Sequence, residues 1–430
     1  MHSASALPPG FVRNLGERIR RAIRSLPARD VDLHDAAMKE DESLNTQRYV
    51  LHIGAPKCGS TAIQSSLDTS RESLKAVGFF YWSDRRHNSF PAREIAGTKY
   101  SDPRSLQYRK VITGFWEQMV EDFRASKDLI PLYSSEYLAS ANSANIQRLV
   151  RDFSDRPLKI VYVVRAPHLV VTSWWQQRIK EGTNKSLSDF VETILQQVDI
   201  QEGPEAYWQD QHFGRVANRW INAGATDFSV VVIDPRDHES TLRNFEQAAG
   251  IPQGVLAPGE FSNESVSLFE AEVLVALNKI IMTRFDREVF DIERQKRGIE
   301  RYIRHIRLTK GPSIEVPHAY RERVTSLAKQ FTAELKESGA KIYGDLANLL
   351  PPEDWAKSAA QEDDAIRISR ADDAERAAGM LLGVALKMAE GERKYQRVWG
   401  SPLPTTPQLV VRFVRELARR VLRRLRRPRS

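Results

Sequence analysis

The stretch from residue 52 to residue 61 reads His-Ile-Gly-Ala-Pro-Lys-Cys-Gly-Ser-Thr, and it decides the fold that we predict. The apolar run 49–53 leads into this stretch, and residues 61–67 have helical character. A strand, a glycine-containing turn and a helix in this order predict an anion-binding loop. Glycines let successive backbone N–H groups point at one anion, and the helix N-terminus adds partial positive charge. Ser60 and Thr61 add hydroxyl donors.

The lysine of this loop is displaced from its usual position. In the common phosphate-binding pattern, G-x-x-x-x-G-K-[ST], the lysine follows the second glycine and meets the β- and γ-phosphates beside Mg²⁺. Gly54 and Gly59 fit that pattern, but Ser60 takes the place of the lysine, and Lys57 lies inside the loop. We therefore expect Lys57 to meet the bond between a 5′-phosphate and the group that this phosphate carries.

Further apolar runs predict strands at residues 129–133, 158–164 and 228–233, with helical spacing between them. Near-continuous apolar strands that alternate with helices favour a parallel sheet covered on both faces. Ser267 and Glu270 fit a helix-capping box, after which the chain becomes helical. The predicted fold is α/β, a P-loop-type sandwich with a central parallel sheet flanked by helices, plus a helical C-terminal part.

The two ends of the chain differ in composition from its middle. We predict a basic amphipathic N-terminal segment and linker over residues 1–46, a P-loop domain over 47–350, and a helical C-terminal extension with an arginine-rich amphipathic tail over 351–430. Apolar residues at helical spacing among arginines in 11–26 and 409–427 favour helices that lie on an anionic membrane surface. Packing on the chain's own domain or on a partner stays open. The tail lacks interleaved aromatic residues, so we expect no specific nucleic-acid partner.

The composition fits a protein that binds anions. The chain has 430 residues, 41% of them hydrophobic, and a formal net charge of +8, which favours anionic partners. Cys58 is the one cysteine, so a disulfide within the chain and a cysteine-based zinc site are excluded. We find neither a secretory h-region nor an apolar run of about 18 residues. We expect a cytoplasmic location, with peripheral attachment at the inner membrane face left open.

Residues 56–61, Pro-Lys-Cys-Gly-Ser-Thr, resemble the 5′-phosphosulfate loop of the sulfotransferases that use 3′-phosphoadenosine-5′-phosphosulfate (PAPS). That loop has a Pro-Lys-x-Gly-[Ser/Thr]-[Ser/Thr] core after a strand, often with threonine or serine where this chain has Cys58. The resemblance implies that Lys57 stabilises the sulfuryl oxygens and the leaving 5′-phosphate. It also implies that this part of the chain binds PAPS through Pro56, Lys57, Cys58, Gly59, Ser60, Thr61 and Ala62.

A second motif strengthens the resemblance. Sulfotransferases carry Arg-x-Pro after such a strand and a serine eight residues beyond the arginine, and Arg165, Pro167 and Ser173 match these positions. In the family the arginine and the serine bind the 3′-phosphate of PAPS, and the guanidinium fork suits a phosphate. Ala166 stands where the family often has aspartate, which puts a local salt bridge in doubt.

Two weaker similarities are to bacterial and glycan-type sulfotransferases: Ser134-Ser135-Glu136 at the end of a predicted strand, and Asn263-Glu264-Ser265 before a long helix. The whole resemblance spans roughly residues 47–285. It implies transfer of a sulfuryl group from PAPS to a hydroxyl or amine, with adenosine 3′,5′-bisphosphate as product. The basic charge favours a saccharide or glycolipid as acceptor. No metal is required, because lysine and helix dipole supply the positive charge.

The base that takes the acceptor proton has two candidates. His87 lies in a polar loop after the first predicted helix, and Glu136 lies at the carboxyl end of a strand, where open α/β sheets place ligands. A role for Glu136 in orienting Lys57 or His87 stays open. We expect the acceptor site in residues 79–110 and around Trp174, Trp175, Gln176 and Arg178, with one of the two tryptophans in the core.

Two alternatives remain open at this point. A P-loop nucleotide kinase or NTPase would use Asp234, which follows the apolar run 230–233, as its Mg²⁺ ligand. The absence of a lysine directly after Gly59 argues against this alternative. A non-catalytic sulfotransferase-like binding protein would keep the fold and use the basic ends of the chain. The presence of Lys57 and Arg165 argues against that one.

Overall fold

The computed structural model describes residues 48–83, 89–97, 113–201, 206–259, 265–284, 298 and 313–356. Residues 11–26, His87 and residues 409–427, for which the sequence predicts functional roles, lie outside the described residues.

The centre of the fold is a six-stranded sheet in the order β2-β3-β1-β4-β5-β6, and every neighbouring pair of strands is parallel. The strands are β1 (Tyr49–His52), β2 (Phe79–Tyr81), β3 (Ile130–Ser134), β4 (Leu158–Val164), β5 (Asp227–Val232) and β6 (Lys341–Tyr343). With the helices that flank the sheet, this arrangement confirms the predicted α/β sandwich.

The central strands are buried because their sequences are almost entirely apolar. All four residues of β1 and six of the seven residues of β4 are buried. Lys159 is the one lysine within β4, and its ammonium lies 2.9 Å from the carboxylate of Asp227, its partner in register on β5. An ion pair thus compensates the charge that the strand buries.

The chain order places several strand ends at one edge of the sheet. From β1 the chain runs to one side, forming β2 and β3, and then crosses to the other side, forming β4, β5 and β6. The topological switch point is therefore at the carboxyl end of β1, where open α/β sheets bind their ligands. Residues that follow β3, β1 and β4 meet at this edge.

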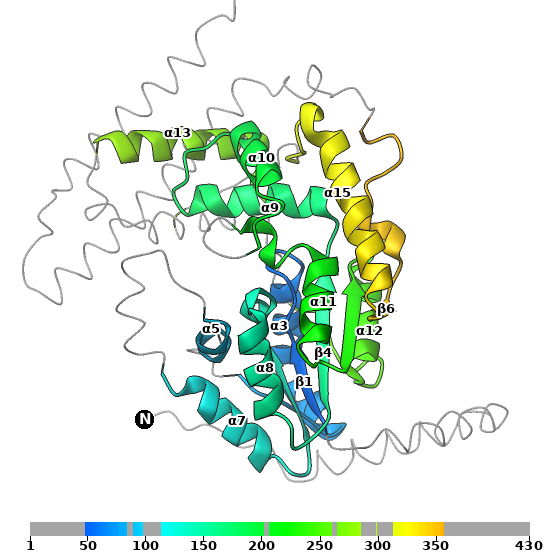
Figure 1. Cartoon of the computed structure of the whole chain (residues 1–430). Coiled ribbons are helices and arrows are strands. Elements are labelled where there is room, and N and C mark those ends of the chain that lie inside the picture. Colours follow the sequence, from blue (N-terminus) through cyan, green and yellow to red (C-terminus); the bar gives the residue numbers. More distant parts are fainter. Residues whose placement is uncertain are drawn as a thin grey trace, which may run out of the picture. The chain divides into compact units, whose positions relative to one another are not determined.

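Helices flank the sheet, as Figure 1 shows. α12 (His238–Ala249) packs against β4, β5 and β6, and α11 (Phe213–Asn222) packs against β5. The other elements around the sheet are α3 (Ser60–Thr69), α4 (Arg71–Ala76), α5 (Phe90–Ala96), α7 (Phe115–Ala125), α8 (Ser143–Asp152) and the 3₁₀ turns η2 (Glu136–Ser140), η3 (Tyr207–Gln209) and η4 (Leu346–Leu349).

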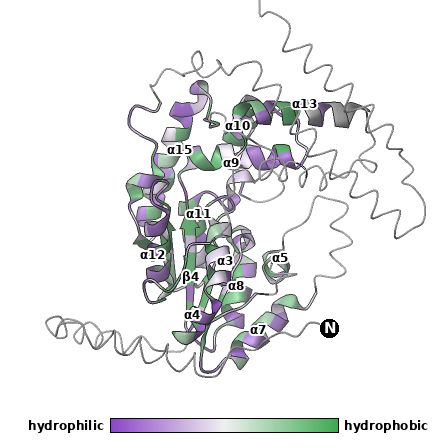
Figure 2. Ribbon diagram, turned by 180° about the vertical axis from the view of Figure 1, so that it is seen from behind, coloured by the Kyte–Doolittle hydropathy of each residue, from purple (hydrophilic) through white to green (hydrophobic). Residues whose placement is uncertain are grey.

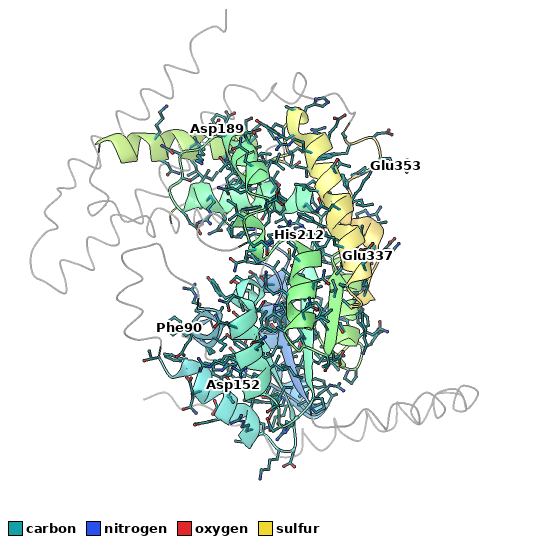
Figure 3. All side chains as sticks on the ribbon, in the orientation of Figure 1. Phe90, Asp152, Asp189, His212, Glu337 and Glu353 are labelled. Carbon is teal, nitrogen blue, oxygen red and sulfur yellow. The ribbon has the colours of Figure 1, made fainter. Side chains whose placement is uncertain are left out.

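A second group of helices gathers around α9 (Pro167–Lys180), which starts after β4. α10 (Leu187–Gln196), α13 (Leu268–Arg284) and α15 (His318–Glu337) all pack against it, and Figure 1 shows α9, α10 and α13 above the sheet. α15 also packs along α11, where the His212 ring stacks on Phe331 with 3.6 Å between ring centres. Figure 3 labels His212 beside α15, where α11 begins.

The distribution of hydropathy agrees with this packing. In Figure 2, β4 is hydrophobic, while α12 and α15 carry both hydrophobic and hydrophilic residues, as helices with one buried side do. Among the helices that the structure describes, none combines the length and the hydrophobicity that a membrane-spanning segment needs.

Candidate functional site

The loop between β1 and α3, residues 53–59, has the shape of an anion-binding turn. Gly59 has φ 73° and is the N-cap of α3, and the amides of Ala62 and Ile63 donate to its carbonyl. The amides of Ser60 and Thr61 belong to the first helical turn, where N–H groups have no intrahelical acceptor. They are the donors that this helix end offers to an anion.

Lys57 has a left-handed backbone, with φ 66°, and it is the one non-glycine residue with positive φ in the described ranges. This conformation costs about 1 kcal/mol or more for a residue with a Cβ, so contacts have to stabilise it. Lys57 Nζ donates to Gln177 Oε1 over 2.9 Å, and Gln177 Nε2 donates to Glu181 Oε1 over 2.7 Å. The predicted catalytic amine therefore lies against α9.

Gln211, in the turn before α11, contacts the two neighbours of Lys57. Its Nε2 donates to the Pro56 carbonyl over 2.7 Å, and Cys58 Sγ donates to its Oε1 over 3.7 Å. Cys58 is 1% exposed, and burial raises the pKa of its thiol to about 12. The thiol is therefore a protonated, buried part of the support of the loop.

His52, the last residue of β1, links two strand ends at the loop. Its Nδ1 lies in a hydrogen bond of 2.7 Å with Ser134 Oγ, at the end of β3. Its ring is so close to Gly54 that a Cβ on Gly54 would overlap Nε2. Burial lowers the pKa of His52 to about 3, so the imidazole is neutral. Gly54 is thus required by this close approach of ring and backbone.

Arg165 follows β4, the strand that pairs with β1, and so it lies at the same edge of the sheet as the loop. The loop is joined to the end of β4 by the Ala55 amide, which donates to the Val163 carbonyl over 3.3 Å, two residues before Arg165. The side chain of Arg165 is partly buried, and burial lowers its pKa, with no contribution from a carboxylate of the described residues. Burial, followed by the charge of Arg165, lowers the pKa of His168 to about 4. The loop and Arg165 therefore lie side by side at the carboxyl ends of β1 and β4.

Pro167 occupies the first turn of α9, where its missing N–H costs no hydrogen bond. Ser173 is partly buried and lies one turn before Gln177, the partner of Lys57. The two predicted halves of the site, the loop and the Arg165–Ser173 segment, are thus brought together by the fold.

The side chains expected in the acceptor site divide into buried and partly exposed ones. Trp175 is 1% exposed and donates to the Lys185 carbonyl, which confirms that one of the two tryptophans is in the core. Gln176 is buried as well and accepts the amide of Val266 over 3.0 Å. Trp174 is partly buried; it packs edge-on against Tyr207, with the guanidinium of Arg178 5.2 Å from its ring centre.

Glu136 starts η2 directly after β3, which is the other neighbour of β1. Gln64 Nε2, on α3, donates to Glu136 Oε2 over 3.1 Å and to the Ser134 carbonyl over 3.4 Å. Glu136 therefore lies at the same edge of the sheet as the loop, with α3 fixing its carboxylate. The other predicted base, His87, falls outside the described residues.

Comparison with known proteins agrees with this geometry. Residues 47–217 match the family model of the sulfotransferase domain. Over this segment the chain resembles the sulfotransferases. The match covers the loop, Glu136, Arg165 and Ser173, and it supports transfer of a sulfuryl group in general terms.

The solved structure of a sulfotransferase from Alicyclobacillus acidocaldarius is similar to the chain with 14% sequence identity and a TM-score of 0.35, over 57% of this chain and 98% of that one. No curated protein matched the sequence.

The sulfotransferase-like domain also contains functional candidates that the sequence did not reveal. Gln177 and Gln211 hold the loop, and Gln64 holds Glu136. Asp210 directly precedes Gln211, and burial raises the pKa of its carboxyl to about 7, although the charges of Arg219 and Arg178 oppose this. No local motif marks these residues, because their partners are far away in the sequence.

Asp234, the Mg²⁺ ligand of the kinase alternative, stabilises its own turn after β5. Its carboxylate accepts the Arg236 amide over 2.8 Å and lies 3.6 Å from the Arg236 guanidinium. The Arg236 amide is the largest cause of the lowered pKa of Asp234. These contacts do not favour the kinase alternative. No cluster of three or more histidine, cysteine, aspartate or glutamate residues that could hold a metal ion was found in the described part of the chain.

Proposed function

We propose that this chain moves a sulfuryl group from PAPS to a hydroxyl or amine of a saccharide or glycolipid. The observation that carries the proposal is the juxtaposition of two motifs. The loop with Lys57 follows β1, Arg165 follows the neighbouring β4, and the Ala55 amide of the loop donates to the Val163 carbonyl of β4 over 3.3 Å. A 5′-phosphosulfate suits the loop and a 3′-phosphate suits the arginine, and PAPS carries both groups on one nucleotide.

The loop supplies positive charge where the reaction requires it. As the acceptor oxygen or nitrogen bonds to sulfur, the bond between sulfur and the 5′-phosphate oxygen breaks, and negative charge develops on the leaving phosphate. The Lys57 ammonium and the amides of Ser60 and Thr61 stabilise that charge. Arg165 and Ser173 bind the 3′-phosphate, which fixes the position of the donor for in-line attack.

The acceptor proton goes to a base at the same edge of the sheet. Glu136, with its carboxylate held by Gln64, is one candidate, and His87 is the other. Substitution of the true base, as Glu136→Gln or His87→Ala, should lower kcat and leave the affinity for adenosine 3′,5′-bisphosphate unchanged. The substitution that leaves kcat unchanged identifies the residue that is not the base.

The donor half of the proposal is tested by calorimetric titration with adenosine 3′,5′-bisphosphate in EDTA, beside a titration with ATP and Mg²⁺. We expect micromolar binding of the bisphosphate without metal, weakened in Lys57→Ala and in Arg165→Ala. Arg323→Ala is the matched control, because Arg323 lies on α15 in an exposed ion pair with Glu192. Binding of ATP with Mg²⁺ that is lost in Asp234→Asn, with no bisphosphate binding, would refute the proposal.

The acceptor half rests on the net charge of +8, which favours anionic partners such as acidic glycans. Radiolabelled PAPS should transfer its label to members of a panel of saccharides and glycolipids. If small phenols or peptides are labelled with a higher kcat/KM than the saccharides and glycolipids, the acceptor belongs to another chemical class.

We also propose a cytoplasmic location with attachment to the inner membrane face. The proposal rests on the arginine-rich, amphipathic sequences of residues 11–26 and 409–427. The full chain should float with vesicles that contain anionic lipid and not with vesicles of phosphatidylcholine alone. Equal flotation with both kinds of vesicle, or with neither, would contradict it.

A further inference from the structure

We propose that Gln177 is a positioning residue for Lys57, whose ammonium it holds toward α9 without neutralising its charge. The inference rests on the proposed function, because it assigns Lys57 to the donor. No local motif in the sequence singles out Gln177.

The amide of Gln177 is itself oriented by two hydrogen bonds. Its Oε1 accepts from Lys57 Nζ at 2.9 Å, while its Nε2 donates to Glu181 Oε1 at 2.7 Å. Glu181 lies one helical turn further along, on the same side of the helix as Gln177. With the NH₂ group bound to this carboxylate, the carbonyl oxygen points to the lysine, which is the arrangement that an ammonium requires.

Gln177 is uncharged, which matters for a lysine that has to bind an anion. A carboxylate in the position of Gln177 would form an ion pair with Lys57 and compete with an anionic donor for the ammonium. An amide oxygen accepts the same hydrogen bond and adds no negative charge beside the ammonium. Glu181 is the next residue in this chain of contacts, and the side-chain amide of Gln177 lies between its carboxylate and Lys57. The Glu181 carboxylate also lies 3.4 Å from the Arg178 guanidinium.

The backbone around Lys57 is held as well. Gln211 binds the Pro56 carbonyl on one side and the Cys58 thiol on the other. Between these contacts Lys57 keeps its left-handed φ of 66°. Gln211 thus fixes where the lysine side chain starts, and Gln177 fixes where it ends.

One helix, α9, carries residues of both parts of the site. Ser173, assigned to the 3′-phosphate, and Gln177 are four residues apart on α9, so their Cα atoms are separated by about 6 Å along the same side of the helix. α9 therefore holds the tip of Lys57 at a fixed distance from the 3′-phosphate site. A donor bound through Arg165 and Ser173 meets a lysine that is already in place.

The test is a double-mutant cycle on binding of adenosine 3′,5′-bisphosphate, measured calorimetrically on the full chain with Gln177→Leu, Lys57→Met and the double variant. We expect Gln177→Leu to weaken binding about tenfold, equivalent to about 1.4 kcal/mol, when Lys57 is present. In the Lys57→Met background the same change should alter binding less than about twofold. Thermal unfolding of each variant shows whether it is folded.

Gln177→Glu provides a second test, the pH dependence of bisphosphate binding. A purely structural role of Gln177 would not produce the pH dependence that we expect. The new carboxylate should pair with Lys57 at neutral pH and weaken bisphosphate binding by more than Gln177→Leu does. Its effect should decrease as the pH is lowered toward the pKa of a glutamate, about 4.3, where the carboxylate becomes neutral.

Gln330→Leu and Gln330→Glu are the matched controls. Gln330, on α15, donates to Glu334 four residues later over 2.9 Å, as Gln177 does to Glu181. We expect unchanged binding in both control variants.

The outcomes separate this inference from the proposed function. If the unmodified chain does not bind the bisphosphate, the proposed function is wrong. If it binds and Gln177→Leu weakens binding equally with and without Lys57, or not at all, the role of Gln177 is wrong and the proposed function stands.

Discussion

The imidazole of His52 and the backbone of Gly54 are packed so closely that residue 54 has no room for a side chain. The ring is fixed on its other side by Ser134, at 2.7 Å from Nδ1. A buried, neutral histidine at the end of β1 therefore determines the path of the chain into the loop.

This contact predicts the effect of Gly54→Ala. The methyl group should displace either the ring or the loop and lower the free energy of unfolding by about 1–3 kcal/mol, the usual range for overpacking. His52→Ala creates the missing space, so Gly54→Ala should cost less in that background. Urea unfolding of the two single variants and the double variant measures the difference. An equal cost in both backgrounds would show that His52 is not the cause.

Although Arg165→Lys conserves the charge, we expect this substitution to impair binding of the 3′-phosphate. Lysine is a single point charge and cannot bind a phosphate bidentately, so we expect the Kd for adenosine 3′,5′-bisphosphate to rise about tenfold or more, about 1.4 kcal/mol. Adenosine 5′-monophosphate, which lacks the 3′-phosphate, provides the control ligand. A similar loss of affinity for both ligands would place Arg165 away from the 3′-phosphate.

Asp210 should make the stability of the fold depend on pH. Burial raises the pKa of its carboxyl from 3.8 to about 7 in the folded chain, so the unfolded chain ionises first as the pH rises. The folded state should lose stability between about pH 4 and pH 7, by about 1.4 kcal/mol for each pH unit over which only the unfolded chain is ionised.

Asp210→Asn removes this effect. The variant should be more stable than the unmodified chain above pH 7, by at least about 1 kcal/mol, and the advantage should shrink as the pH falls toward 4. Asp199→Asn, whose side chain is 97% exposed, is the control. A difference that is the same at both ends of the pH range would mean that Asp210 is not the titrating group.

Cys58 should be unreactive in the folded chain. With its pKa raised to about 12 by burial, only about one thiol in ten thousand is ionised at pH 8, and the side chain is 1% exposed. Labelling with a thiol reagent should give one label per chain in urea and almost none without it, since Cys58 is the only cysteine. Rapid labelling of the native chain would show that the loop opens to solvent.

Much of the fold was predictable where local sequence and tertiary structure agree. β4 has the predicted bounds, Leu158–Val164, because a run rich in β-branched residues matches a strand that is buried on both faces. The predicted capping box before α13 is present as well: the Ser267 amide donates to Glu270 and the Glu270 amide to Ser267. In these segments neighbouring residues alone specify the structure.

Two strands were missed. β2 and β6 have three residues each, too few for a period of two to be recognised. β6 lies at the edge of the sheet with Lys341 exposed, so it lacks the apolar run that reveals a central strand. Each of them is defined by the strand it pairs with.

The site shows the same limit. The roles of the loop and of the Arg165 motif were predicted from short sequence patterns, and the structure brings the two motifs together. The contacts of Gln177 with Lys57 and of Gln211 with Pro56 span 120 and 155 residues of sequence. Glutamine has no pattern of its own in either place, so only the folded chain reveals these partners.

The position of β6 has a consequence for how the chain is made. The strands around the loop, β1, β3 and β4, are complete once residue 164 has been synthesised. β6 is the last strand of the sheet and pairs with β5, but it follows β5 by roughly 100 residues in the sequence. Pairing between segments so far apart in the sequence slows folding. During synthesis the edge of β5 is therefore unpaired for that length of chain, and an unpaired strand edge promotes association with other chains. Chaperones that bind nascent chains should recognise this protein chiefly in that interval.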